Sequence, residues 1–136
     1  MATTIFLVNP QTFSGSPFTN EKSLLFDGVD EYLSCGVVSE LVSATSFSIS
    51  FWVKFNSSTN GFCFGHYSSG DNGVYLRSDV STNLWRMVVG NGGASYHDYS
   101  YTINTGQWYH VVMTYDGGQS GSNKMKFYID GSVKTT

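Results

Sequence analysis

Two alternating segments near the end of the chain, WYHVVMTYDG at 108–117 and KMKFYIDG at 124–131, each finish in Asp-Gly. Alternation of apolar and polar residues is typical of half-buried strands, and Asp-Gly suits the positive φ angles of tight hairpin turns. The two segments therefore predict neighbouring antiparallel strands. Only five residues follow Gly131, so we expect the partner of the last strand to come from outside this sequence.

The clearest strand in the sequence is the ten-residue segment 46–55, SFSISFWVKF. One face of it is apolar and carries Phe47, Ile49, Phe51, Val53 and Phe55, whereas serine, tryptophan and lysine fall on the other. Further strands are expected at 22–27, 31–35, 61–66, 74–77, 84–89, 96–102, 107–115 and 124–129. Glycine-rich and Asn/Asp-rich turns separate them. The best candidate for a short helix is 38–42.

Composition supports the same fold class. The 136 residues include 16% aromatic and 12% charged side chains, with fifteen glycines and two prolines. This balance suits one β-rich domain with weakly charged faces and argues against a disordered chain or a helical bundle. We expect an all-β fold of two antiparallel sheets, a sandwich or jelly roll, over residues 22–136, preceded by an irregular N-terminal arm at 1–21.

Charge and hydropathy exclude several partners. The net charge is −3 and the seven Lys and Arg residues are dispersed, so no basic stripe exists for a nucleic acid. The apolar run Ile5–Val8 is too short for a signal-peptide core or a membrane span. We therefore expect no nucleic-acid binding, no membrane insertion and no recognisable signal peptide.

The two cysteines, Cys35 and Cys63, fit no zinc-binding spacing. A lone pair in a chain without a signal peptide favours two reduced, partly buried thiols, and one disulfide is the alternative.

Several motifs occur in a specific order: FDGVD at 26–30, FSISFWVKF at 47–55, WYHVVMTYDG at 108–117 and YIDG at 128–131. In this order they resemble the laminin G-like domains of the concanavalin A-like lectin and glucanase superfamily, over about residues 22–134. The resemblance implies a jelly-roll sandwich with one concave and one convex sheet. It also implies that Trp52 and Trp108 pack in the core or between the sheets, and that His110 is packed or hydrogen-bonded.

The chain departs from that family after the second Asp-Gly. Laminin G-like domains continue there with further strands, including one that returns beside the N-terminal strand. Unpaired edges are an aggregation hazard, so we expect these strands to belong to a longer polypeptide. A strand-sharing oligomer is the second possibility.

Catalysis is not indicated. The Glu-x-Asp-x-Glu arrangement of glucanase relatives is absent, and no nucleophile-elbow motif occurs. Asp27, Asp30 and Glu31 are the densest carboxylates, and we interpret them as turn-closing residues. The alternative is a role in binding Ca²⁺, which many relatives of this kind bind at loops.

A polar aromatic segment at 94–101, ASYHDYSY, is unlike the aliphatic core strands. Aromatic faces stack on the C–H patches of sugars, and carboxylates accept hydrogen bonds from their hydroxyls, so this segment is a candidate glycan platform. The candidate ligand-binding residues are Trp85, Arg86, Tyr96, His97, Asp98, Tyr99 and Tyr101. The alternative is that these tyrosines are ordinary half-buried strand residues.

These observations predict a non-enzymatic surface or structural module. A bacteriophage virion component, either a capsid decoration or a tail protein with glycan affinity, is the first hypothesis, because such a protein reaches the outside by host lysis. The alternative is a lectin-like module of a larger secreted or cell-surface protein. Its partners would be other protein subunits and cell-surface glycans, and its location virion or extracellular.

Overall fold

The computed structural model describes residues 3–7, 22–41, 44–57, 60–68, 72–90 and 94–134. Within these residues the chain forms nine strands and two single-turn 3-10 helices, η1 (Ser39–Leu41) and η2 (Gly121–Asn123). The strands are β1 (Thr3–Leu7), β2 (Ser46–Phe55), β3 (Gly61–Ser68), β4 (Asn72–Asp79), β5 (Leu84–Gly90), β6 (Ala94–Ser100), β7 (Trp108–Asp116), β8 (Met125–Ile129) and β9 (Ser132–Lys134).

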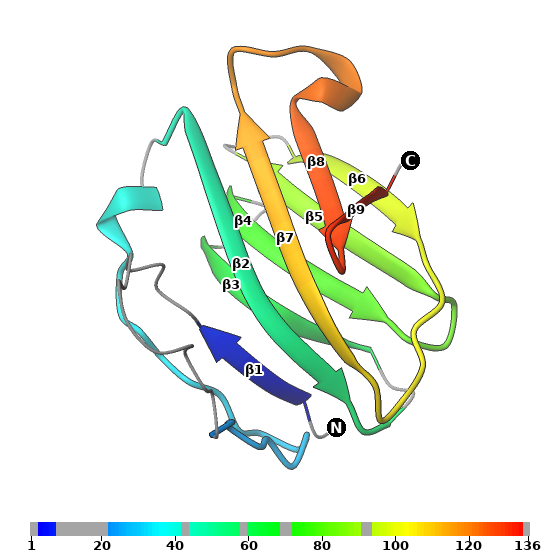
Figure 1. Cartoon of the computed structure of the whole chain (residues 1–136). Coiled ribbons are helices and arrows are strands. Elements are labelled where there is room, and N and C mark those ends of the chain that lie inside the picture. Colours follow the sequence, from blue (N-terminus) through cyan, green and yellow to red (C-terminus); the bar gives the residue numbers. More distant parts are fainter. Residues whose placement is uncertain are drawn as a thin grey trace, which may run out of the picture.

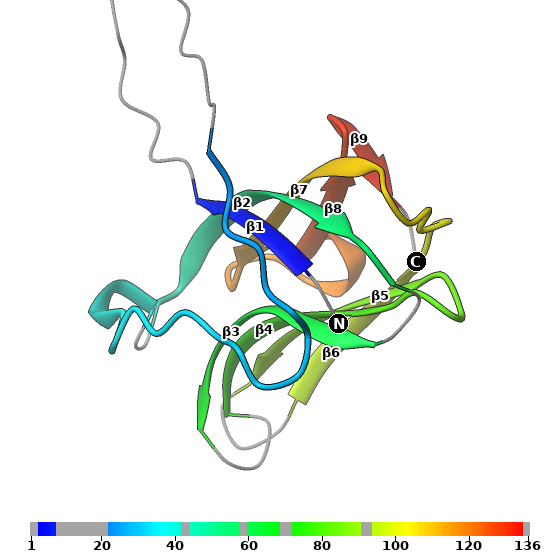
Figure 2. The same ribbon diagram turned by 90° about the horizontal axis from the view of Figure 1, so that it is seen from below.

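The strands form two antiparallel sheets, one of five strands in the order β1-β2-β7-β8-β9 and one of four in the order β3-β4-β5-β6. The sheets lie face to face as two layers (Figure 1 and Figure 2). This confirms the predicted all-β, two-sheet sandwich. The predicted strand at 46–55 has the same bounds as β2, which pairs with β7 over nine residue pairs from Ser46–Asp116 to Lys54–Trp108.

The strand that ends in the second Asp-Gly, β8, pairs with other strands of this chain on both sides. β8 pairs with β7 on one side and with β9 on the other. Asp130 and Gly131 form the turn between β8 and β9 with φ angles of 51° and 76°, the left-handed conformation that a two-residue hairpin turn requires. The expectation that β8 lacks a partner within this sequence was therefore wrong, because three residues after such a turn suffice to pair.

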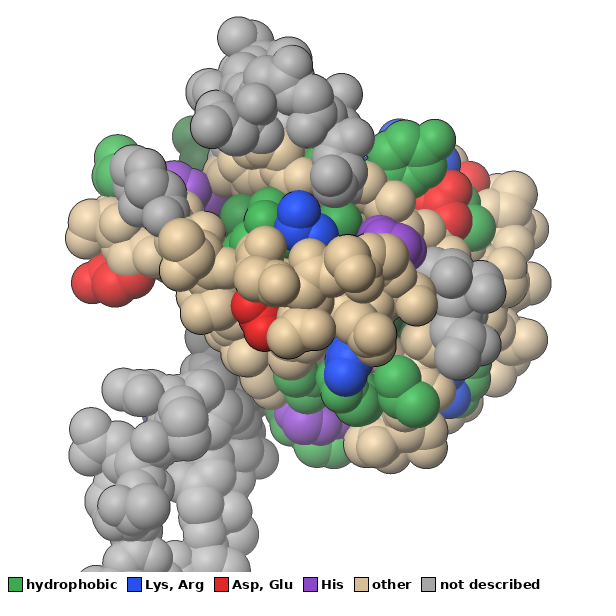
Figure 3. Space-filling view, turned by 90° about the horizontal axis from the view of Figure 1, so that it is seen from above, with side chains coloured by type: hydrophobic (Ala, Val, Ile, Leu, Met, Phe, Trp, Pro, Cys, Tyr) green, Lys and Arg blue, Asp and Glu red, His purple; other side chains and the backbone are tan. Residues whose placement is uncertain are grey.

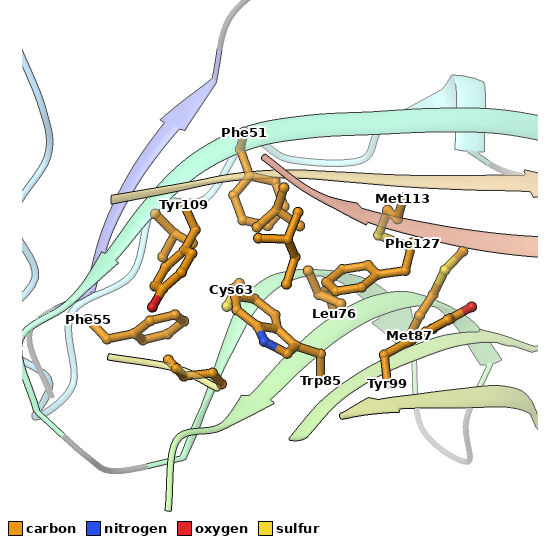
Figure 4. Close-up of a cluster of buried hydrophobic side chains, with 14 of the residues drawn as sticks. Phe51, Phe55, Cys63, Leu76, Trp85, Met87, Tyr99, Tyr109, Met113 and Phe127 are labelled. Carbon is orange, nitrogen blue, oxygen red and sulfur yellow. The ribbon is translucent and has the colours of Figure 1, made fainter. Parts of the chain in front are cut away.

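The core lies between the two sheets and is rich in aromatic rings (Figure 4). Trp85 of β5 is fully buried, and its ring centroid lies 5.5 Å from that of Phe55, 5.4 Å from that of Phe127 and 6.4 Å from that of Tyr109. Each of these residues points inward because alternate side chains of a strand face the same side. Trp85 therefore joins the two layers at their centre.

Residues 22–27 and 31–35, predicted as strands, belong to neither sheet. These short apolar runs have a strand-like composition, but a strand also requires a neighbouring strand to bond its backbone groups. The segment 22–38 instead runs along the side of the sandwich where the edge strands β1 and β3 lie (Figure 1 and Figure 2). The predicted helix at 38–42 corresponds to η1, which is a single 3-10 turn.

The predicted N-terminal arm contains a strand of the sandwich. β1 pairs antiparallel with β2 from Thr3–Phe55 to Leu7–Phe51. The apolar run Ile5–Val8 thus lies largely in a strand, where an irregular arm was expected, and it extends the five-stranded sheet. The remainder of 1–21 lies outside the described residues.

Both cysteines are free thiols, as predicted, and no disulfide joins them. The expected partial burial was wrong for both: Cys35 is exposed, whereas Cys63 is buried in the core and donates to Ser78 Oγ at 3.7 Å. Burial raises the pKa of the Cys63 thiol to about 12, because a thiolate is poorly solvated in an apolar interior.

We expect one thiol per folded chain to react with an aromatic disulfide reagent at pH 8, because the thiolate is the reacting species and only Cys35 is accessible. The second thiol should react only after denaturation. The variant Cys35→Ser should then show no rapid reaction at all. Equal reaction rates for both thiols in the native protein would contradict the buried position of Cys63.

Candidate functional site

The seven candidate ligand-binding residues do not share one surface. The sequence pattern placed His97, Tyr99 and Tyr101 on one side of their strand and Tyr96 and Asp98 on the other, and the burial of β6 agrees with this division. Trp85 and Tyr99 are only 0% and 2% exposed, so they are core residues and not ligand contacts. Alternation predicts which side chains share a face, but it does not say which face is covered by the second sheet.

Three of the candidates meet on the outer face of the four-stranded sheet. Arg86 of β5 lies directly opposite Asp98 of β6, and Val88 lies opposite Tyr96. On the other side of β5, Arg77 and Tyr75 of β4 lie opposite Arg86 and Val88. We call these six residues the outer patch: Tyr75, Arg77, Arg86, Val88, Tyr96 and Asp98.

A bidentate ion pair organises one end of the outer patch. Arg86 Nε donates to Asp98 Oδ1 at 2.6 Å, and Nη2 donates to Oδ2 at 2.7 Å. The hydrogen bonds from Arg86 hold the pKa of the Asp98 carboxyl below its usual value and, reciprocally, raise the pKa of Arg86. Arg86 Cζ also lies 4.9 Å from the centroid of the Tyr96 ring, a cation–π distance. The two hydrogen bonds and the Tyr96 ring thereby hold the guanidinium in one orientation.

The other row of the outer patch is apolar. Val88 is only 1% exposed, yet it does not belong to the core cluster between the sheets. Its neighbours across the strands, Tyr75 and Tyr96, are half-buried and 57% exposed respectively. The next outward positions on β4 and β5 are Gly73 and Gly90, which pair with each other. The aromatic row is therefore followed by a pair of positions without side chains.

Tyr101 and His97 lie elsewhere. Tyr101 follows the end of β6, and the Lys134 ammonium lies 4.3 Å from its ring centroid. It borders an open depression of about 530 Å³, whose lining is otherwise polar: Thr82, Asn83, Ser100, Thr102 and Asn104. His97 is half-buried, and its ring centroid is 6.2 Å from that of Tyr99. These two residues are separate from the outer patch.

Trp52, Trp108 and His110 lie on the outer face of the five-stranded sheet, so the core or inter-sheet position expected for the two tryptophans was wrong. Trp52 is 41% exposed, and its ring lies 5.0 Å from that of His110. His110 Nε2 and Ser50 Oγ form a hydrogen bond of 2.8 Å, which confirms the predicted packed and hydrogen-bonded role. Trp108 is half-buried on the same face beneath the Lys54 ammonium, 5.3 Å from its ring centroid. The alternation in 46–55 had already placed Trp52 opposite the apolar face.

The carboxylates at 27–31 close a turn, as predicted. Val29 N–H donates to Asp27 Oδ1 at 2.8 Å, and Asp27 N–H donates to Glu31 Oε2 at 2.6 Å. Both of these oxygens thus accept backbone hydrogen bonds, which is the role of turn-closing residues. Within the described ranges no group of three or more His, Cys, Asp or Glu side chains is placed to hold a metal ion.

Charged side chains are sparse on the surface. Lysine, arginine and acidic residues lie scattered among uncharged polar atoms on the face shown in Figure 3. No helix in the described part of the chain is long and apolar enough to cross a bilayer.

Comparison with known proteins agrees with this architecture. A search of curated proteins and a search of solved structures found no match. Residues 27–136, however, match the sequence profile of a laminin G-like family described as the concanavalin A-like lectin/glucanases superfamily. The matched range includes every strand from β2 to β9. The chain therefore belongs to the laminin G-like domains of the concanavalin A-like lectin/glucanase superfamily.

Proposed function

We propose that this domain is a non-enzymatic surface module that docks on another protein subunit through residues 22–37. The observation that carries this proposal is a run of exposed apolar side chains outside both sheets: Leu24 (48% exposed), Leu25 (69%), Val29 (83%), Tyr32 (83%), Leu33 (55%) and Val37 (79%). Single exposed apolar residues are ordinary, but six within fourteen positions are typical of an interaction surface.

The backbone of this segment supports the same proposal. Backbone N–H groups of this segment donate to side chains two to four residues away, as from Gly36 N–H to Ser34 Oγ at 3.4 Å. The short apolar runs there led us to expect strands, and an added strand from a partner would pair with the backbone and cover apolar side chains together. A virion surface, as a capsid decoration or tail component, is the setting we propose, because the uncharged, Ser/Thr/Gly-rich faces suit packing among many subunits.

The test is the mass of the natural protein in solution by light scattering. An assembly of several chains is expected at micromolar concentration. A monomer that shows no association up to millimolar concentration would contradict the proposal.

A second function, carbohydrate binding, is favoured by the outer patch. Exposed Tyr96 offers a ring face for the C–H side of a sugar, and the Arg86–Asp98 pair offers fixed donors and acceptors for its hydroxyls. Because Asp98 has a lowered pKa, it remains ionised at neutral pH and loses its acceptor charge only as pH falls through that value. This function suits either a virion protein that adheres to cells or a lectin-like module of a secreted or cell-surface protein.

Replacing Tyr96 with alanine should weaken saccharide binding by about two- to tenfold, since stacking of one ring contributes about 0.5–1.5 kcal/mol. Binding is measured by a glycan array followed by calorimetry on the saccharides retained. The matched control is Tyr128→Ala, which changes a half-buried tyrosine of β8 in the other sheet. Equal losses in the two variants would place binding elsewhere.

A further inference from the structure

We infer that the partner of residues 22–37 is a second copy of this chain, which binds them with the outer patch of its four-stranded sheet. This inference rests on the proposed docking function and names the partner. The segment presents six exposed apolar side chains. It also has a net charge of −2, because it holds one basic and three acidic residues: Lys22, Asp27, Asp30 and Glu31. A complementary surface is therefore apolar and carries an excess of positive charge.

The outer patch has exposed apolar surface. Beyond residues 22–37, four large apolar side chains of the described residues are exposed, and two of them lie on this face: Phe62 (53%) and Tyr96 (57%). Phe62 of β3 lies opposite Arg77, and its ring meets that of Tyr75 edge to face at 5.3 Å. Exposed aromatic carbon therefore extends from the edge strand β3 to the edge strand β6, on which Tyr96 lies.

The outer patch also has the opposite charge. It holds two arginines and one carboxylate, so its net charge is positive. Both oxygens of Asp98 accept hydrogen bonds from Arg86, so this carboxylate is committed to one guanidinium. Arg77 is exposed, and within the described residues no carboxylate forms an ion pair with it. A carboxylate of the docked segment would offset the repulsion between Arg77 and Arg86, which lie opposite each other on neighbouring strands.

The outer face of the five-stranded sheet is a poorer match. Its strands β2 and β8 carry Lys54 and Lys126. Asp116 ends β7 and Asp130 follows β8, so these two carboxylates offset the two lysines. Positive charge therefore exceeds negative charge on the outer patch but not on this face.

The two surfaces lie on different sides of the same chain. The segment runs along the side where β1 and β3 lie (Figure 2), whereas the outer patch is on the outer face of the four-stranded sheet. A contact between unlike surfaces is heterologous, so a chain docked on one neighbour can still receive another. Such contacts build a ring or an open array, in agreement with the proposed assembly of several chains.

The test mixes two variants that each lack one surface. The segment variant changes Leu25, Val29 and Leu33 to serine, and the patch variant carries Phe62→Ser and Arg77→Glu. Each variant alone should associate at least about tenfold more weakly than the wild-type protein, because it loses apolar contact area. An equimolar mixture should form a 1:1 complex and no larger species, because each variant keeps the surface that the other lacks. Sedimentation velocity measures both results, at a concentration where neither variant associates alone.

The matched control for the patch variant is Val133→Ser with Lys126→Glu. This pair removes an apolar side chain of similar exposure, 55%, and reverses one charge, but on the other sheet. It should assemble as the wild-type protein does. Phe62 and Arg77 are exposed, so the patch variant should keep its melting temperature. If it does not, Arg77→Glu alone should still weaken association more than Lys126→Glu alone.

The outcomes separate this inference from the function it rests on. If the wild-type protein assembles but the mixed variants form no complex, the segment meets another segment or a different surface. That result would overturn the inference and leave docking through residues 22–37 intact. A patch variant that assembles as well as its control would overturn the role of the outer patch in the same way. A wild-type protein that stays monomeric up to millimolar concentration would overturn the docking function itself.

Discussion

Replacement of Trp85 with alanine is expected to lower the free energy of unfolding by about 3–5 kcal/mol, the usual cost of deleting a large buried aromatic side chain. Trp85 is fully buried and its ring contacts rings from both layers, among them Phe55 and Phe127. A domain of this size is stabilised by about 5–15 kcal/mol in total. The variant should therefore be partly unfolded near its physiological temperature, as measured by denaturant unfolding followed by circular dichroism.

Two controls make this prediction specific. Trp52→Ala removes the same side chain from a 41% exposed position and should cost less than about 1.5 kcal/mol. Trp85→Phe should cost less than alanine, because it keeps a ring and removes the indole N–H, which has no hydrogen-bond partner within the described residues. Equal costs for Trp85→Ala and Trp52→Ala would contradict the assignment of Trp85 to the core.

The largest expected effect on assembly comes from the apolar segment. Changing Leu25, Val29 and Leu33 together to serine should weaken association of the natural protein by at least about 100-fold, since each buried aliphatic side chain contributes about 1.5–3 kcal/mol. These residues are 55–83% exposed in the isolated chain, so the melting temperature of the isolated domain should not fall. Sedimentation velocity over a concentration series measures the change.

The matched control is Val133→Ser on β9, which is also 55% exposed but lies in a paired strand. This variant should assemble as the wild-type protein does. If the triple variant still assembles normally, the interface lies elsewhere. If its melting temperature falls by many degrees, the segment packs on its own domain and the docking proposal loses its basis.

The fold was largely predictable because alternation is a local property of the sequence. The segment 46–55 showed both its strand and its buried face, and the two Asp-Gly turns predicted neighbouring strands. The segments at 22–27 and 31–35 show the limit of this reasoning. A short apolar run indicates that a segment can form a strand, but the strand also needs a neighbour, and local sequence carries no information about one.

The candidate site was predictable in part for a similar reason. The sequence indicated a polar aromatic strand at 94–101 and grouped Tyr96 with Asp98 correctly. It did not reveal that Arg86 pairs with Asp98, because this depends on the register of two strands. Nor did it reveal that Trp85 faces inward and Trp52 outward, because that depends on where the second sheet packs.

The most direct test of the central claim is amide hydrogen exchange of residues 22–38 in the natural protein, measured at high concentration and again after dilution. We predict slow exchange in the assembly and fast exchange after dilution, because a partner subunit covers the segment only in the assembled state. Fast exchange at both concentrations would show that nothing covers it. Protection that persists on dilution would show that the same polypeptide covers it, and either result would contradict docking through this segment.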